Sequence, residues 1–205
     1  MSGCTSLKSL VWVAWYLASI QEGVFAMKMQ PRVRCLLIIH VLLSAAAAGQ
    51  GEFSVKEENG VRAQMRDGVS LVADIFWPDQ DGTFPVLLQR TPYDRGMSSS
   101  QARELTSYGY IVVVQDTRGR FQSEGEFYPF RNETADGVDT VEWVTTLPGS
   151  NGKIGMYGGS YVGATQMLTA IGNPPHLVSI FPFVTGSEYY DGWTYQSGAF
   201  MHWFA

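Results

Sequence analysis

The sequence predicts an α/β protein built around a mostly parallel, doubly wound sheet. Strand and helix patterns alternate along the chain from Phe53 onward. The β-branched run at 111–114 is typical of a strand buried in a parallel sheet. Ser160 lies between glycines, where an apolar run meets a helix-forming segment. A leading hairpin followed by repeated β-α units of this kind implies helices packed against one mixed sheet.

The elements can be justified in chain order. An Asp-Gly turn signal at 66–68 joins the first two strands into a hairpin. The long helix carries an apolar stripe and stops at a Pro-Gly pair, residues 148–149. The predicted strands are 61–65, 70–76, 86–89, 111–114, 153–157 and 178–184, and the predicted helices are 99–108, 133–147 and 161–171.

The segment around Ser160 has the strand, sharp turn and helix of a nucleophile elbow. Gly158, Gly159 and Gly163 supply the small residues that such a strained turn needs. The helix that follows directs its unpaired N–H groups toward the place where an oxyanion would form. The spacing is Gly-x-Ser-x-x-Gly, which differs from the usual Gly-x-Ser-x-Gly. On these residues alone, a simple Gly-Gly-Ser loop between two elements is the alternative.

Composition narrows the class of protein. The chain has 205 residues, 45% of them apolar, and a formal charge of −5, so one domain is expected and nucleic acid is not an expected partner. The two cysteines, Cys4 and Cys35, lie near the N-terminus, which leaves the body without a disulfide or a cysteine metal site. We expect no metal and no cofactor.

The N-terminal region resembles an export signal. Residues 28–34 carry three positive charges, 35–44 are apolar, and 45–48 are small residues suited to cleavage. This pattern predicts a signal peptide over 27–48 and a secreted or periplasmic protein without stable membrane association. We interpret residues 1–26 as a start codon assigned too far upstream. The alternative is a membrane anchor made of two short segments.

Several short motifs together resemble one family. They are Met65-Arg66-Asp67-Gly68-Val69, Arg90-Thr91-Pro92-Tyr93, Gln115-Asp116-Thr117-Arg118-Gly119-Arg120, Ser123-Glu124-Gly125, the segment 136–143, and Gly158-Gly159-Ser160-Tyr161-Val162-Gly163. Their order and content resemble the cocaine-esterase and Xaa-Pro dipeptidyl-peptidase family of serine hydrolases, also called CocE/NonD hydrolases. The resemblance spans about residues 60–200 and implies the α/β-hydrolase fold.

The resemblance implies a role for individual residues. Ser160 would be the acyl-accepting nucleophile, and the backbone N–H of Tyr161 would donate to the oxyanion. The phenol of Tyr93 would be the second oxyanion donor. A helical cap would begin in the aromatic segment 189–204, where Tyr190 and Trp193 could line a substrate pocket; ordinary packing is the alternative for these aromatics.

The charged residues near the sheet edge have a different expected role. Asp116, Arg118 and Glu124 follow the strongest predicted strand, and Asp136 lies in the first turn of a helix. We expect all four to form ion pairs and hydrogen bonds that order the wall of the site, and not to take part in the reaction.

The base and the acid of a triad are not evident. His176 follows the elbow helix and should lie about 16 Å from Ser160, at the far end of that helix. Asp191 and His202 have the right order but come soon after the sixth strand, whereas the family's acid and histidine follow later strands.

We therefore expect residues 49–205 to be the N-terminal part of a longer catalytic domain, inactive alone and lacking the rest of the cap and the last strands. The substrate would be an ester, an X-Pro peptide or an α-amino-acid ester. The alternative is a truncated, non-catalytic or binding-only product.

Overall fold

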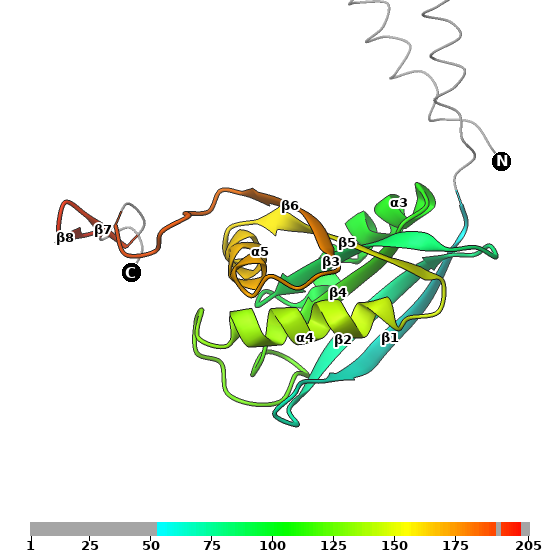
Figure 1. Cartoon of the computed structure of the whole chain (residues 1–205), viewed down its shortest axis with the longest axis horizontal. Coiled ribbons are helices and arrows are strands. Elements are labelled where there is room, and N and C mark those ends of the chain that lie inside the picture. The colour runs from blue at the N-terminus through cyan, green and yellow to red at the C-terminus, as the bar shows by residue number, and fades with distance from the viewer. Residues whose placement is uncertain (1–52, 192–193, 202–205) are drawn as a thin grey trace, which may run out of the picture. The chain divides into compact units, whose positions relative to one another are not determined.

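A six-stranded sheet is the centre of the computed structural model, which describes residues 53–191 and 194–201 (Figure 1). Its strand order is β1-β2-β4-β3-β5-β6. The strands are β1 (Val55–Gln64), β2 (Ser70–Pro78), β3 (Phe84–Thr91), β4 (Ile111–Asp116), β5 (Ser150–Gly159) and β6 (Leu177–Phe183). β2 is antiparallel to both of its neighbours, and the pairs β4–β3, β3–β5 and β5–β6 are parallel. The predicted mostly parallel α/β fold is confirmed.

The hairpin predicted around residues 66–68 is present. Gly68 has φ 87°, which a residue without a side chain adopts easily, and Val69 N–H donates to the Asp67 carboxylate at 3.1 Å. β1 starts at Val55, six residues earlier than predicted, and contains an irregularity between Glu58 and Val61. Of the six added residues, three are charged and five are exposed, as is usual for an edge strand.

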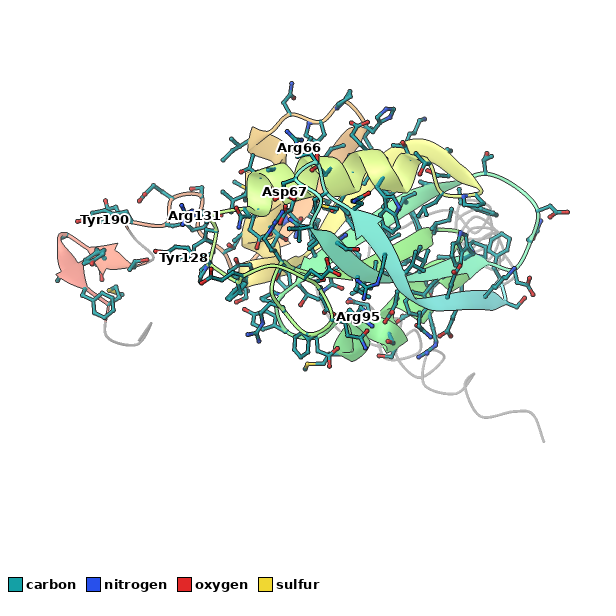
Figure 2. The ribbon with its side chains drawn as sticks, turned by 90° about the horizontal axis from the view of Figure 1, so that it is seen from below. Arg66, Asp67, Arg95, Tyr128, Arg131 and Tyr190 are labelled. Carbon is teal, nitrogen blue, oxygen red and sulfur yellow. The ribbon has the colours of Figure 1, made fainter. Side chains whose placement is uncertain are left out.

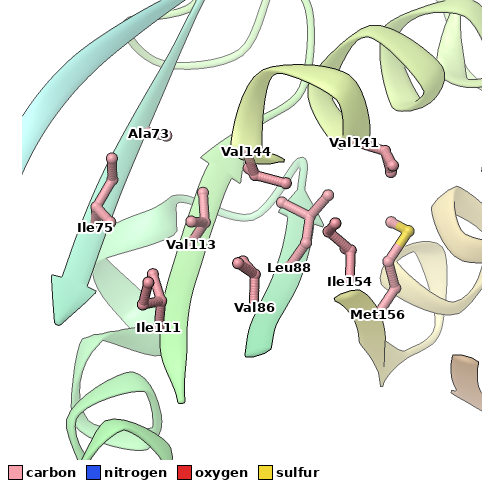
Figure 3. Packing of buried hydrophobic residues seen from close by; sticks show 10 residues of the cluster. All are labelled: Ala73, Ile75, Val86, Leu88, Ile111, Val113, Val141, Val144, Ile154 and Met156. Carbon is pink, nitrogen blue, oxygen red and sulfur yellow. The ribbon is translucent and has the colours of Figure 1, made fainter. Parts of the chain in front are cut away.

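Helices cover both faces of the sheet. α4 (Glu133–Thr145) packs on one face, and α3 (Ser99–Ser107) packs on the other, directly after the 3₁₀ helix η1 (Arg95–Ser98). The strand β4 is buried throughout and supplies side chains alternately to the two faces. Figure 3 shows the larger core, under α4, which consists of Ala73, Ile75, Val86, Leu88, Ile111, Val113, Val141, Val144, Ile154 and Met156.

β5 leads directly into α5 (Tyr161–Ile171), and this junction is the predicted elbow. α5 packs beside α4 and over β3, β5 and β6. β6 lies at the edge of the sheet and, among the described residues, pairs only with β5. Its Phe181 is 68% exposed.

A short hairpin of β7 (Tyr195–Gln196) and β8 (Ala199–Phe200) follows β6. The described residues 184–191 and 194–201 contain no helix, so the helical start of a cap that the resemblance implied is not found in them.

Two expectations fall outside this region. The signal peptide at 27–48 and the segment 1–26 lie outside the described residues, and both stay predictions. Within the described residues, none of the helices has the length and apolar character needed to cross a membrane.

Candidate active site

Ser160 lies at a strained turn between β5 and α5. Its backbone has φ 58° and ψ −130°, a conformation that is costly for a residue with a side chain, and the residue is exposed. Gly158 has φ 127°, and a Cβ at this position would collide with Val162. A Cβ on Gly159 would lie 2.5 Å from Cε2 of Phe183. The glycines on this side of the serine are therefore required by close approach of the chain, as the elbow interpretation predicts.

Gln166, which the sequence analysis did not single out, stabilises this turn through hydrogen bonds. Its side chain is fully buried in α5. The amide Nε2 donates to the Gly158 carbonyl at 2.9 Å, and Oε1 accepts from Phe181 N–H at 3.0 Å. The Ser160 N–H donates to the Phe183 carbonyl at 3.0 Å. The serine is thus held by α5 and by β6, and its side chain remains free to face solvent.

Tyr93 lies next to this serine. Its phenol oxygen is 3.2 Å from Ser160 Oγ, and the side chain is 48% exposed. The loop that carries it follows β3 and is fixed at two points. Tyr93 N–H donates to Thr91 Oγ1 at 3.0 Å, and Arg120 Nε donates to the Pro92 carbonyl at 3.0 Å. The two side chains that the sequence analysis placed at the site, 67 residues apart, are in hydrogen-bond contact.

Tyr161 supplies the helix N-terminus beside the serine. As the first residue of α5, it has no preceding helical turn whose carbonyl could accept its N–H. Its side chain is buried, and the phenol donates to Glu133 Oε1 at 2.9 Å while accepting from Phe130 N–H at 2.9 Å. Burial, together with the neighbouring Glu133 carboxylate, raises the pKa of the Tyr161 phenol, so the phenol keeps its proton.

Ion pairs hold the segment that follows Tyr93. Asp116, fully buried at the end of β4, pairs with Arg95, and Arg95 Nε also contacts Asp74 Oδ1 at 2.8 Å. Burial raises the pKa of the Asp116 carboxyl, and the contact with Arg95 opposes this shift. In Figure 2, Arg95 lies in the lower part of the view, away from Arg66 and Asp67. The expected structural role of Asp116 fits these contacts.

A second set of ion pairs joins the first hairpin to α4. Arg118 contacts Asp136 Oδ1 at 2.5 Å and Asp67 Oδ2 at 2.8 Å. These contacts raise the pKa of the Arg118 guanidinium. Glu124 pairs with Arg62 of β1 at 3.0 Å. All three carboxylates engage arginines, which is the scaffold role expected of Asp136, Arg118 and Glu124.

The comparisons with known proteins agree with this geometry. Residues 67–205 match the X-Pro dipeptidyl-peptidase (S15) family. The chain belongs to this family. It is 40% identical over 154 residues to the cocaine esterase of Rhodococcus sp. (strain MB1 Bresler), covering 72% of this chain.

Solved structures of similar proteins have the same fold. An α-amino acid ester hydrolase superposes with a TM-score of 0.58 at 31% identity, covering 69% of this chain and 27% of that one. A CocE/NonD family hydrolase from Staphylococcus aureus gives a TM-score of 0.56 at 30% identity, covering 60% of this chain and 26% of that one. These matches confirm the predicted α/β-hydrolase fold. The chain spans only about a quarter of the length of these relatives, 26% for cocaine esterase.

The S15 resemblance also implied a pocket lined by Tyr190 and Trp193. Tyr190 stacks on Tyr195 of the short hairpin, with ring centroids 4.6 Å apart, and Figure 2 shows it beside that hairpin. Trp193 lies outside the described residues. Tyr189, one residue earlier, joins the site region instead, because its ring stacks on Phe130 at 4.8 Å. The pocket role of Tyr190 and Trp193 stays a prediction.

No histidine is found next to Ser160 among the described residues. His176 Nδ1 contacts the Gly152 carbonyl at 3.1 Å. Ser160 is eight positions further along β5 and its turn than Gly152, a distance of about 26 Å at about 3.3 Å per residue. His40 and His202 lie outside the described residues, and Asp191 is exposed. The exclusion of His176 on geometric grounds is supported.

Proposed function

We propose that this protein is a serine hydrolase that cleaves an ester or amide bond through an acyl-enzyme on Ser160. The contact that carries the proposal is the 3.2 Å approach of Ser160 Oγ to the Tyr93 phenol, beside the N-terminus of α5. An exposed serine at a strained strand-to-helix turn, with two donors aimed at one point, is the arrangement that acyl transfer requires.

The reaction would proceed in two steps. Ser160 Oγ attacks the substrate's carbonyl carbon, and the negative charge that develops on the carbonyl oxygen is stabilised by the Tyr93 phenol and the Tyr161 N–H. Collapse of the tetrahedral intermediate expels the alcohol or amine and leaves the acyl group on Ser160. Attack by water on the acyl-enzyme then releases the acid and restores the serine.

The same reaction needs a group that takes the proton of Ser160 and returns it to the leaving group. No described histidine is placed to do so, and we propose that this group lies outside the described residues. In the resting site the Tyr93 phenol contacts Oγ itself. In the reaction it would turn its hydrogen bond to the new oxyanion, which is bonded to the substrate carbon that Oγ attacks and is therefore two bonds away from Oγ.

Three substrate classes are consistent with the relatives. The S15 family is described as X-Pro dipeptidyl-peptidase, and the similar proteins include a cocaine esterase and an α-amino acid ester hydrolase. We propose that the substrate is a small-molecule ester or a short peptide. We also propose that the enzyme is exported, to the periplasm or the medium. Comparing hydrolysis of p-nitrophenyl acetate, phenylglycine methyl ester and Gly-Pro p-nitroanilide by the full-length protein would assign the class.

Labelling with a fluorophosphonate tests the nucleophile directly. The full-length protein should be labelled, and Ser160→Ala should lose both labelling and turnover of all three substrates. Ser187→Ala, which alters an exposed serine on the loop after β6, is the matched control and should behave as wild type. Labelling that survives in Ser160→Ala at the wild-type rate would overturn the assignment.

A further inference from the structure

A buried network of polar side chains connects the two residues that would donate to the oxyanion. The Tyr161 phenol donates to one carboxylate oxygen of Glu133 at 2.9 Å, and the other oxygen lies 2.8 Å from Nη1 of Arg90. Arg90 belongs to β3, three residues ahead of Tyr93 on the same strand and loop. Glu133 therefore touches both halves of the site without reaching Ser160.

The residues of this polar network have little freedom to move. The Arg90 side chain is fully buried and that of Glu133 is 4% exposed. Arg90 Nε donates to Gln115 Oε1 at 2.9 Å, and the Arg90 carbonyl accepts from Thr165 Oγ1 of α5 at 3.1 Å. A buried charge pair of this kind is costly to break, because each charge would then be left unpaired in the interior.

The aromatic ring of Tyr161 is held as firmly as its hydroxyl. It stacks on Phe130 with centroids 4.9 Å apart and planes inclined by 17°. Phe127 lies against it from another direction, at 5.9 Å. Since ring and hydroxyl are both fixed, the peptide group between Ser160 and Tyr161 cannot rotate without breaking these contacts. A donor that is already aimed before charge develops costs no reorganisation during the reaction.

We propose that Glu133 is a positioning residue for the oxyanion hole, holding the Tyr161 N–H through the Tyr161 phenol and the Tyr93 strand through Arg90. This inference rests on the function proposed above. Glu133 touches no reacting atom, and its contribution is to keep two donors, one from the loop after β3 and one from the start of α5, aimed at one point.

Removing one hydroxyl tests the proposal with little disturbance. Tyr161→Phe deletes the hydrogen bond to Glu133 and the one accepted from Phe130 N–H, and it leaves the stacked ring and the Glu133–Arg90 pair in place. Tyr157→Phe is the matched control, because the Tyr157 phenol is buried three residues before Ser160 and has no hydrogen-bond partner among the described residues.

The measurements use the full-length protein and separate positioning from folding. They are the concentration of active sites by burst titration, kcat per active site, KM, and the affinity of a boronic acid, which forms a tetrahedral adduct with the serine. For Tyr161→Phe we expect kcat per active site and boronic-acid affinity each to fall about tenfold, equivalent to about 1.4 kcal/mol, with KM changed by less than about twofold. Tyr157→Phe should leave all of these quantities within about twofold of wild type.

A second variant tests whether Glu133 acts through Tyr161. Glu133→Gln keeps an acceptor for the phenol, and combining it with Tyr161→Phe should lower kcat by less than the product of the two single effects. If Glu133→Gln fails to fold, Tyr161→Phe alone decides.

Two results would overturn the inference while leaving the hydrolase proposal intact. One is a Tyr161→Phe enzyme whose kcat per active site equals that of Tyr157→Phe. The other is a loss confined to the number of active sites, which would mean that the contact serves folding only. A wild-type protein without Ser160-dependent turnover would overturn the proposed function and this inference together.

Discussion

Tyr93→Phe is the sharpest test of the oxyanion assignment, because it removes one oxygen atom and nothing else. The Tyr93 phenol has Ser160 Oγ as its hydrogen-bond partner, and its side chain is about half exposed. The loop is anchored through backbone groups, namely Tyr93 N–H on Thr91 and the Pro92 carbonyl on Arg120. The variant should therefore keep its fold, with a midpoint of thermal unfolding within about 2 °C of wild type, since surface changes alter stability by less than about 0.5 kcal/mol.

The magnitude of the kinetic effect follows from when the hydrogen bond is used. In the resting protein, water can replace the 3.2 Å contact at this half-exposed position, so its loss there is small. In the transition state the phenol faces a full negative charge, and removing one such donor costs about 2.7–4 kcal/mol, or about 10²–10³ in kcat. KM should change little, because the missing interaction is made in the transition state.

Steady-state kinetics of ester hydrolysis by the full-length enzyme, corrected for active sites by burst titration, would measure this effect. Tyr108→Phe alters another exposed tyrosine, which precedes β4 and so lies at the opposite end of the parallel strands from Ser160, and this control should match wild type. A fall in kcat of less than about threefold with intact folding would refute the assignment and return Tyr93 to a packing role. A raised KM with unchanged kcat would point instead to substrate binding.

Three further predictions concern the elbow, the core and the N-terminus. Gly158→Ala should lower the free energy of unfolding by more than about 2 kcal/mol, because it adds a collision with Val162 to an unfavourable φ. Gly68→Ala is the control: this position has a positive φ but open space around it, so the loss measured in the same denaturant titration should be smaller. Leu88→Ala should cost about 2–5 kcal/mol, since Leu88 is fully buried in the core under α4, and a loss below about 1 kcal/mol would show that the packing is looser than described. N-terminal sequencing of the exported protein should find a mature chain that begins near Gly49, and an uncleaved N-terminus on membrane-bound protein would contradict the predicted signal peptide.

The elements that were predicted well from the sequence are those whose burial produces a recognisable pattern of apolar residues. The run 111–114 is apolar at every position because β4 is covered on both faces. β1 shows the opposite case. Its first residues, including Lys56, Glu57 and Glu58, are charged because the strand lies at an exposed edge, and no alternation marks them as a strand. The predicted start at residue 61 was therefore six residues late.

The helix predicted at 133–147 is present, but its apolar stripe explains only part of what the helix buries. The apolar stripe accounts for Val141 and Val144, yet Glu133, Asp136 and Thr140 are equally buried. These polar residues face arginines and a glutamine from β3, β4 and the loop after β4. Such pairs join residues far apart in the chain, and charge alone does not say which arginine meets which carboxylate. The network around Glu133 could not be predicted for this reason.

The residues of the candidate site also differ in how well the sequence predicts them. Ser160 and the Tyr161 N–H follow from one local turn, so the chain reveals them directly. Tyr93 is 67 residues away, and only the family resemblance indicated it. Gln166 left a weak signal, because it is a long polar residue among the mostly small and apolar residues of α5.

The register of two parallel strands explains why Tyr93 reaches Ser160. In the pairing of β3 with β5, Val86 lies opposite Ile154 and Leu88 opposite Met156, a constant offset of 68 positions (156 − 88). Carried to the ends of both strands, this offset places position 92 opposite Ser160 (160 − 68), and Tyr93 is the next residue in the loop. A slip of one residue would turn every side chain of β3 to the other face and remove Leu88 from the core under α4. The same burial that fixes the core therefore also fixes the distance between Ser160 and the Tyr93 phenol.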